Sequence, residues 1–263
     1  MVNIGESAVL LTLNPNPPLC SLVECIWHHE GTSGVHGREH VLPDARFQIV
    51  FNLDEGKGAV CGIRSQHVVI DPARTPWMMG VVFRPGGSLG FLGASALEFW
   101  NRSVALDLVS RAQATSIIDQ LREAGSAHNR LRILEMALTF RMQSSERAMH
   151  PAVNYALQLF NNTPHVSTVA DVSMEIGWSR RWFSQTFSEQ VGMTPKHYCR
   201  LMRFCKIVRQ IASNQRVDWA DVALSGGFYD QAHLIHEFRA FSGLSPERYF
   251  RAEHPFPNHV RID

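Results

Sequence analysis

Basic side chains are concentrated between residues 177 and 216, where their type and spacing suit contact with a phosphate backbone. This stretch of 40 residues holds eight basic residues and one acid, so its net charge is 8 − 1 = +7, although the whole chain carries only +1. Lysine and arginine neutralise phosphates, and arginine and glutamine also match the edges of guanine and adenine. We interpret the segment as a nucleic-acid-binding surface, with a solvated helix face as the alternative. The acid is Glu189, and the basic residues are Arg180, Arg181, Lys196, Arg200, Arg203, Lys206, Arg209 and Arg216.

Other residue types capable of chemistry do not form a catalytic pattern that we recognise. Walker-type and His-Glu-x-x-His spacings are absent from the sequence. The five cysteines are odd in number and lack Cys-x-x-Cys spacing, which argues against a disulfide framework, a zinc site or the reactive-cysteine motif of a repair alkyltransferase. The sequence therefore predicts a protein without enzymatic activity or cofactor, and the cytoplasm is the expected location.

Four histidines near the N-terminus raise the question of a metal site: His28, His29, His36 and His40. Neighbouring side chains of a strand point to opposite faces, so at most one of His28 and His29 faces an interior, and the His-x-His…Glu spacing is missing. Histidines in loops or on the surface are the better interpretation, and no metal is expected. No apolar run reaches about 18 residues, and the N-terminus lacks the basic start of a signal peptide, so no membrane segment is expected.

The elements that must position the basic residues are two copies of one pattern. Asp171 and Asp221 are 50 residues apart, and Tyr198 and Tyr249 are 51 apart, so one residue was added inside the second copy. Each copy has an N-cap residue, a glycine–aromatic turn, two apolar residues four apart, and a Pro-x-x-Tyr segment. The pattern predicts two helix–turn–helix units, at about 168–190 and 218–241, with a structural helical hairpin as the alternative for each unit alone.

One long helix is predicted over 196–211, between the two units. A rigid spacer of this length would place the two reading helices about one DNA turn apart, on one face of the double helix. A further helix is expected to begin at Pro151. From that residue to the C-terminus the pattern is helical, and no strand is expected.

The N-terminal half has the pattern of a β-rich domain. Short runs of β-branched and aromatic residues, bounded by turn residues, predict strands at 8–13, 21–28, 46–53, 59–63, 67–70 and 78–84. Alternation from Phe47 to Leu53 indicates that one face of that strand is buried. Helices are predicted at 94–100, 114–124 and 128–142, and the polar segment 141–150 is interpreted as a linker. The expected fold is α+β, with a barrel-like domain over 1–143 and an all-α domain over 144–263.

The motifs GWSRRWFSQTFSEQVGMTPKHY and GGFYDQAHLIHEFRAFSGLSPERY give the segment from about 151 to 250 a close resemblance to the DNA-binding domain of AraC/XylS-family transcription regulators. The resemblance implies two helix–turn–helix units that read adjacent major grooves. Matching the motifs position by position, the first reading helix would present Arg180, Arg181, Ser184 and Gln185. The second would present Gln231, Ala232, His233, Ile235 and His236. Lys196 and Arg200 add positive charge beside them.

This chain departs from the family pattern at three places. Trp182 stands where a smaller polar or imidazole residue is usual, so it either packs under the helix or lies against the DNA backbone. Ser173 stands where alanine is usual and is small enough for the helix crossing. Asp230 and Glu237 make the second unit less basic, and Asp230 is expected to cap its helix. His233 would either contact DNA or, as the alternative, hold the turn together. We therefore expect the first unit to supply more of the affinity and the second to select among sites.

A weaker resemblance links the N-terminal half to sensor-like domains of some AraC-type regulators. It rests on residues 25–31 (CIWHHEG), on 41–44 with 50–53, and on 82–87 (VFRPGG), and it implies a domain for effector binding or dimerisation. Aromatic and polar residues are the general expectation for a ligand pocket. The alternative is that the aromatics are ordinary core and that Arg84 pairs with Asp44. The candidates are Trp27, Asp44, Arg46, Phe51, Trp77 and Arg84.

The sequence as a whole predicts a DNA-binding transcription regulator controlled through its N-terminal domain by a small molecule or by dimerisation. The alternative is a small-molecule-binding β-domain protein whose helical half is a protein-interaction module. Expected partners are double-stranded operator or promoter DNA and, as further candidates, a small-molecule effector, RNA polymerase and a second copy of the chain.

Overall fold

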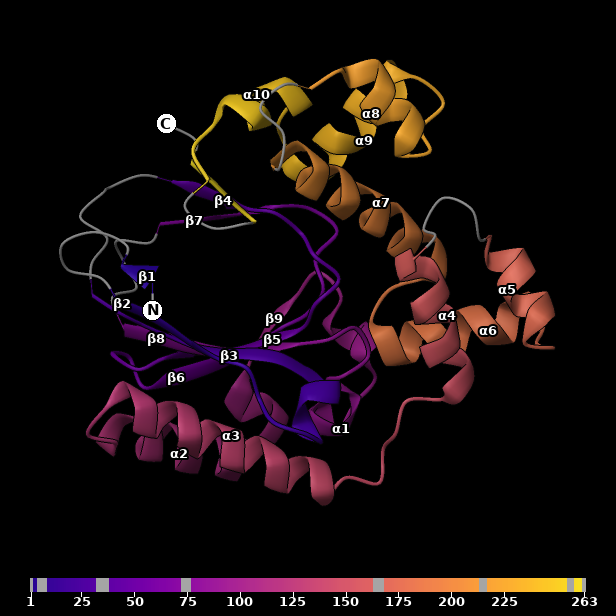
Figure 1. Ribbon diagram of the computed structural model, residues 1–263. Coiled ribbons are helices and arrows are strands. Elements are labelled where there is room, and N and C mark those ends of the chain that lie inside the picture. The colour runs from indigo at the N-terminus through magenta and orange to yellow at the C-terminus, as the bar shows by residue number, and fades with distance from the viewer. Residues whose placement is uncertain are drawn as a thin grey trace.

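The computed structural model describes residues 2–3, 9–31, 38–71, 77–162, 168–212, 217–254 and 258–261. Figure 1 shows a large sheet in the indigo and purple part of the chain, with the magenta helices beneath it. A smaller sheet lies above, and the orange and yellow helices form the right-hand and upper parts of the molecule. The expected α+β class is confirmed, with strands gathered in the first half and helices in the second.

Seven antiparallel strands form the large sheet: β1 (Val2–Asn3), β2 (Val9–Leu13), β3 (Val23–Glu30), β5 (Gln48–Asn52), β6 (Lys57–Cys61), β8 (Trp77–Phe83) and β9 (Ser103–Ala105). Their order is β1-β2-β3-β8-β5-β6-β9. The predicted alternation in and around β5 is confirmed, because Phe47, Phe51 and Leu53 are all buried. Over the described residues the sheet is open at both edges, so the barrel-like expectation is replaced by an open sheet.

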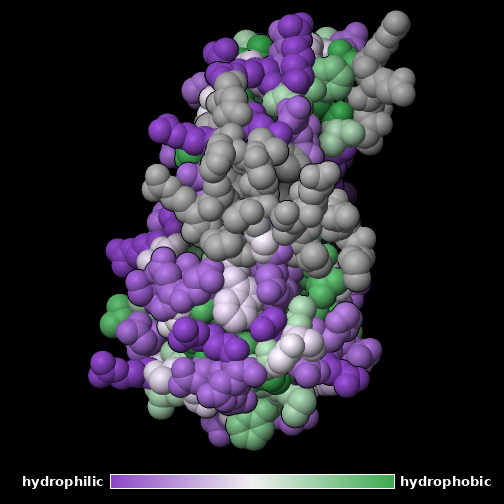
Figure 2. Space-filling view, turned by 90° about the vertical axis from the view of Figure 1, so that its left-hand side faces the viewer, coloured by the Kyte–Doolittle hydropathy of each residue, from purple (hydrophilic) through white to green (hydrophobic). Residues whose placement is uncertain are grey.

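Two helices, α2 (Leu106–Glu123) and α3 (Ala127–Gln143), cover one face of the large sheet. Their inward residues recur at helical spacing, as the sequence predicted for α3. In the lower part of Figure 2, hydrophilic residues predominate and hydrophobic ones are scattered, as expected for amphipathic helices with their apolar side on the sheet. Shorter helical turns are η1 (Leu19–Ser21), α1 (Leu89–Leu92) and η3 (Ala96–Phe99), the last within the helix expected at 94–100. The buried residues of α2 and α3 include Ile118, Leu121, Leu131, Leu134 and Leu138.

A second, three-stranded sheet corrects the expectation that the chain is purely helical after Pro151. It consists of β4 (Glu39–Val41), β7 (Val68–Ile70) and β10 (His259–Arg261), in the order β10-β4-β7. β10 comes from the C-terminal end and pairs antiparallel with β4, with Val260 opposite His40. A strand of three residues has too few positions to show alternation. Its hydrogen-bond partners lie more than 200 residues earlier, so no local pattern could have predicted it.

The C-terminal helices confirm both predicted helix–turn–helix units. Thr168 and Asp171 form a capping box at the start of the first unit, and Asp218 caps the second. The turns use Gly177 and Gly227, whose φ angles of 71° and 73° lie in the left-handed region that favours glycine. The helices are α4 (Pro151–Asn162), α5 (Val169–Glu175), α6 (Arg180–Val191), α7 (Pro195–Ala212), α8 (Trp219–Ser225), α9 (Gln231–Ser242) and α10 (Pro246–Arg251).

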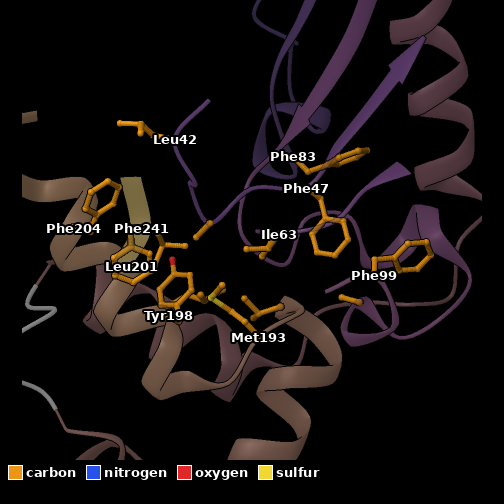
Figure 3. Packing of buried hydrophobic residues seen from close by; sticks show 14 of the residues in the cluster. Leu42, Phe47, Ile63, Phe83, Phe99, Met193, Tyr198, Leu201, Phe204 and Phe241 are labelled. Carbon is orange, nitrogen blue, oxygen red and sulfur yellow. The ribbon is translucent and has the colours of Figure 1, made fainter. Parts of the chain in front are cut away.

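The two halves share one hydrophobic core. Figure 3 shows Ile63 and Phe47 on the N-terminal side near Met193 and Tyr198 at the start of α7, with Phe99 beyond Phe47. All five side chains are at most 5% exposed. The predicted division at residues 143 and 144 falls where α3 ends, and residues 145–150 separate it from α4. The domain boundary itself stays a prediction.

Candidate DNA-binding interface and effector-binding face

The first reading helix, α6, carries most of its predicted contact residues in the open. Arg180, Arg181 and Gln185 are exposed, and Ser184 is half-buried. The Gln185 amide donates a hydrogen bond to a carboxylate oxygen of Glu189 at 3.0 Å, one helical turn away. The two arginines therefore stand ready for phosphate or guanine, whereas Gln185 must leave Glu189 to contact a base.

Trp182 lies on the surface of α6 rather than under it, with 56% of the residue exposed. Its ring makes an edge contact with Trp178 in the turn, at a centroid distance of 6.0 Å, and Trp178 in turn contacts His150 before α4 at 4.7 Å. This row of rings fixes an exposed aromatic side chain beside the two arginines. Ser173, at the helix crossing, is buried, and its hydroxyl donates to the Ala170 carbonyl at 2.9 Å. Serine therefore fits where the family usually has alanine.

The second reading helix, α9, begins at Asp230, whose carboxylate accepts from the His233 backbone amide at 2.7 Å. The expected capping role of Asp230 is confirmed. The His233 ring accepts from the Tyr229 amide at 3.3 Å and lies edge-on to Phe228 at 5.4 Å, so it holds the turn together. His233 is half-buried, as is Ile235, and the exposed predicted contact residues are Gln231, Ala232 and His236.

Arg200 does not stand free for DNA, because it forms a bidentate pair with Glu237 of α9. Its Nε and one terminal nitrogen donate to the two Glu237 oxygens at 2.9 and 2.7 Å. The guanidinium also lies over the Phe241 ring, 5.7 Å from its centre. Burial alone would raise the pKa of Glu237, but the hydrogen bonds and charge of Arg200 outweigh it and lower the pKa overall. The pair therefore ties α7 to the second reading helix.

The remaining basic residues of α7 are likewise of two kinds, those that are exposed and those that are bonded within the fold. Lys196, Lys206 and Arg209 are exposed, and Arg209 donates from Nε to the Cys205 carbonyl at 3.2 Å. Arg203 is half-buried and donates to the carbonyl of Gly227 in the second turn at 3.4 Å. Arg216, the last residue of the basic segment, lies outside the described residues. Among the described residues of this segment, the exposed basic side chains are thus Arg180 and Arg181 on α6 and Lys196, Lys206 and Arg209 on α7.

Asp44 and Arg46 are the predicted effector residues that the structure brings together. An Arg46 Nη lies 2.8 Å from Glu24, and its Nε lies 3.5 Å from Asp44. Burial raises the pKa of Asp44 to about 6, while Arg46 acts in the opposite direction. Arg84 does not pair with Asp44, since its Nε donates to the Cys20 carbonyl at 2.9 Å. The alternative pairing of Arg84 with Asp44 is therefore wrong.

Trp77 belongs to a different cluster, beneath the large sheet. Its indole nitrogen donates to His28 at 3.2 Å, and the Arg130 guanidinium lies 4.7 Å from the centre of its ring. Arg130 also lies 3.6 Å from Glu30 and donates to the carbonyl of Leu121 at the end of α2. Burial, and then Arg130, lower the pKa of His28. These contacts fasten α2 and α3 to the sheet, and Phe51 on the same side is core.

Trp27 lies on the opposite face of the sheet, which α2 and α3 do not cover. Strand register places Trp27, Gly80, Val50 and Ala59 in one row across four strands. The indole lies close to Gly80, where an added β-carbon would be 2.7 Å from the ring. Among the described residues, Trp27, Val50 and Ala59 are half-buried and do not pack against the main core. The strand alternation could have identified Val50 and its neighbours Gln48 and Met78, which sequence reasoning missed.

A serine motif between β8 and α1 also escaped the sequence reasoning. Gly86-Gly87-Ser88-Leu89-Gly90 has the Gly-x-Ser-x-Gly spacing of hydrolase nucleophiles, at a strand–turn–helix junction. Ser88, however, is 1% exposed, and its hydroxyl has no hydrogen-bond partner in the described structure. A nucleophilic serine needs a base within hydrogen-bond reach. The glycines serve packing instead, since a β-carbon at Gly87 would lie 2.2 Å from the Leu22 carbonyl.

Cysteines and histidines show no arrangement suited to redox or metal chemistry in the described residues. Burial raises the pKa of Cys199 and of Cys205 to about 12, so both stay as thiols at neutral pH. No cluster of three metal-ligating side chains occurs among the described positions, and His36 lies outside them. None of the described helices is both long and apolar enough to cross a membrane.

Comparison with known proteins agrees with this geometry. Residues 172–252 match the family model of a helix-turn-helix domain, and residues 11–105 match a domain of unknown function, DUF6597. The chain is 26% identical over 252 residues to the HTH-type transcriptional activator RhaR of Klebsiella pneumoniae subsp. pneumoniae, covering 86% of this chain and 83% of that protein.

Two solved structures are also similar. ToxT from Vibrio cholerae has a TM-score of 0.41 and 9% identity, covering 92% of this chain and 97% of its own. The C-terminal domain of the response regulator AraT from Geobacillus stearothermophilus has a TM-score of 0.37 and 20% identity, covering 40% and 88%.

Two capped helix–turn–helix units with exposed basic and amide residues, joined to a β-rich domain, define a DNA-binding transcription regulator. Within that class, the helical domain is of the AraC type. The motifs of both units are similar to those of AraC/XylS-family regulators, and the similarity to the activator RhaR extends over most of the chain.

Proposed function

We propose that α6 and α9 read base sequence in adjacent major grooves, and that the first unit supplies most of the affinity. The observation that carries this proposal is the contrast between the two helices. α6 exposes Arg180 and Arg181, and its phenylalanines are buried against the core. α9 exposes Gln231 and His236, and its Glu237 is buried in an ion pair within the fold. Arginine is the commonest specific partner of guanine and also neutralises phosphate, so α6 is better suited to hold the duplex.

Replacement of Gln185 with alanine tests this assignment. We expect relaxed specificity at one or two base positions, at a cost of about 1–3 kcal/mol each, with little change on unrelated DNA. Fluorescence anisotropy of the full chain measures the affinity for a duplex selected from a random library and for unrelated DNA. Gln113→Ala, an exposed glutamine of α2, is the matched control. Binding that ignores sequence and salt would instead favour a helical half that serves as a protein-interaction module.

We also propose that the face of the large sheet opposite α2 and α3 receives a small-molecule effector with an apolar surface. Trp27 offers an aromatic side chain next to Gly80, and the half-buried Val50 and Ala59 continue the row. Apolar residues with a few polar groups are the usual lining of ligand sites. Gln48 and Asn52, on the same face, supply hydrogen-bonding groups.

A thermal-shift screen of small molecules tests the effector proposal. A compound at about 100 times its Kd stabilises the chain by roughly 2.7 kcal/mol. Trp27→Ala should weaken such compounds by about tenfold or more, as expected for the loss of an aromatic contact worth about 1.4 kcal/mol. Leu97→Ala, on the exposed side of η3, should leave the binding of these compounds unchanged. Compounds that bind Trp27→Ala as tightly as the unchanged chain would place the effector elsewhere.

We propose further that this regulator acts in the cytoplasm, without catalysis, where its DNA target resides. The buried, protonated thiols of Cys199 and Cys205 support the absence of cysteine chemistry. A second copy of the chain and RNA polymerase stay predicted partners. Sedimentation measures association with a second copy, and transcription in vitro with purified polymerase measures the effect on RNA polymerase.

A further inference from the structure

The C-terminal end of the second reading helix is held by two histidines of the N-terminal half. The Nδ1 of His40 lies 2.9 Å from the Ser242 carbonyl, and the His67 backbone amide donates to the Phe241 carbonyl at 2.8 Å. A carbonyl only accepts, so His40 carries its proton on Nδ1. The last carbonyls of a helix lack partners within the helix. Here the N-terminal half provides partners for two of them.

The two histidine rings also fit the backbone that follows α9. They stack on each other with centroids 4.0 Å apart and planes at 21°. The residue after α9 is Gly243, with a φ of 73°, and a β-carbon there would lie 2.5 Å from the His67 ring. The absence of a side chain at this position therefore lets the His67 ring approach the helix end closely.

The chain beyond the second unit returns to the same small sheet. β10 pairs with β4, and the Leu42 amide donates to the Asn258 carbonyl at 2.7 Å. Val260 is fully buried, and the His259 ring lies 2.8 Å from a carboxylate oxygen of the buried Glu39. β4 thus contacts the chain at two places around α10. His40 contacts the end of α9, which precedes α10, and β10, which follows α10, pairs with β4. We refer to Glu39, His40, His67 and His259 as the clasp.

The first unit is held by different parts of the N-terminal half. The Ser95 hydroxyl, at the start of η3, donates to the Glu189 carbonyl of α6 at 3.3 Å. Gly192, directly after α6, is so close to Phe47 that a β-carbon would lie 2.7 Å from its ring. In Figure 1, α7 alone runs between the two units, and the two sheets lie alongside it. Each unit is therefore fixed to its own part of the N-terminal half.

We infer that the clasp positions the second reading helix for DNA, so that the small sheet helps to set the spacing of operator segments that the chain accepts. This inference rests on the proposed function, in which α6 and α9 both read DNA. His40 and His67 are positioning residues, since they contact the helix end rather than the duplex. With the clasp closed, the second helix meets DNA only at one distance and angle from the first. With it open, the second helix is still held to α7 by the Arg200–Glu237 pair and by the packing of Phe204, but it loses its restraint on the N-terminal side and tolerates a wider range of spacings.

The test is a spacing series on DNA. A duplex selected from a random library by the full chain is altered by inserting up to about five base pairs, roughly half a helical turn, between its two contacted segments. A correctly spaced second unit acts at high effective concentration, so we expect the unchanged chain to lose about 100-fold in affinity on the altered duplex. His40→Ala should lose less than about tenfold there and should bind the original duplex more weakly, because its second unit is no longer held in place.

Rescue separates positioning from general damage to the fold. His40→Asn can still donate from its amide to the Ser242 carbonyl, and it should restore the spacing preference. Glu39→Gln, which removes the charge opposite His259 without changing size, should show a weaker form of the His40→Ala effect. His128→Ala, an exposed histidine of α3, is the control and should behave like the unchanged chain. Hydrogen exchange should show the amides of Leu42 and His67, which donate to the Asn258 and Phe241 carbonyls, losing protection in the clasp variants.

The outcomes are distinct. If the unchanged chain shows a spacing preference and His40→Ala keeps it in full, the inference is overturned and the proposed function stands. If the unchanged chain selects no sequence from the library, both fall. A spacing preference lost in His40→Ala and restored in His40→Asn, with His128→Ala unaffected, supports the clasp as a positioning device.

Discussion

Replacement of Glu237 with alanine is expected to lower the free energy of unfolding by about 2–3 kcal/mol. Removing one partner of a fully buried ion pair costs roughly 3–5 kcal/mol, because the other charge is left without compensation. The expected loss is smaller here because Arg200 keeps 31% of its side chain exposed, against 11% for Glu237. Urea unfolding of the full chain, followed by circular dichroism, measures the change.

The pH dependence of this effect has a definite sign. The folded-state pKa of Glu237 lies below its usual value of 4.5, since the hydrogen bonds and charge of Arg200 outweigh burial, which acts to raise it. The pair therefore contributes its full stability above pH 4.5 and loses it as the pH falls through the lowered pKa. Glu237→Ala should accordingly weaken the chain most at neutral pH and should flatten the acid side of its stability curve.

Two comparison variants make the Glu237 result interpretable. The joint replacement of Arg200 with methionine and Glu237 with leucine should be close to neutral, because apolar pairs of similar size often replace buried ion pairs without loss. Glu247→Ala breaks the exposed pair with Arg251 in α10 and should change stability by less than about 0.5 kcal/mol. A loss in Glu247→Ala equal to that in Glu237→Ala would show that the buried pair has no special role.

Replacement of both Arg180 and Arg181 with alanine is expected to weaken DNA binding by about 30-fold at 0.15 M salt. Each phosphate contact contributes about 0.9 to the slope of log affinity against log salt, so the loss of two contacts removes about 1.8 from it. Extrapolated from 1 M to 0.15 M salt, that slope corresponds to roughly 30-fold. Anisotropy titrations at several salt concentrations measure the affinity and the slope together.

The matched control removes the same charge from a distant surface. Arg111 of α2 and Arg132 of α3 are exposed and lie in the N-terminal half. Their joint replacement with alanine should leave the salt slope unchanged within about 0.5. If this control weakens binding as much as the α6 variant, the affinity comes from overall charge and not from the first reading helix.

The helical half was predictable because its signals are local. An N-cap such as Thr168 bonds to the backbone three residues away, and a turn glycine such as Gly177 determines the conformation of its own residue. Phe183 and Phe187 face the core because a helix brings residues four apart to one side. Duplication of the whole pattern then made the two units recognisable without any knowledge of their packing. Most strands of the large sheet were also found from local signals, namely short runs of β-branched and aromatic residues bounded by turn residues.

The candidate contact residues were less predictable, because a side chain's partner can come from any part of the chain. Charge alone placed Arg200 with the DNA-binding residues, but the fold brings it within 2.7 Å of Glu237, 37 residues later. Trp27 and Trp77 are both tryptophans in strands of the large sheet. The register of β3 and β8 places Trp27 on the face opposite α2 and α3, and places Trp77 beside His28 on the side of these helices.

Composition, local spacing and the repeat after about 50 residues were enough to predict two helix–turn–helix units, a basic first reading helix and a β-rich partner domain. The AraC type was predicted from the resemblance of the two motifs to that family. How the units are held depends on the tertiary structure. The pairing of β10 with β4, and the contacts of His40 and His67 with the end of α9, join residues that lie about 170 to 220 positions apart. Hydrogen bonds between such distant segments form only when the whole chain is folded. A strand of three residues is too short to show the periodicity from which it could be predicted.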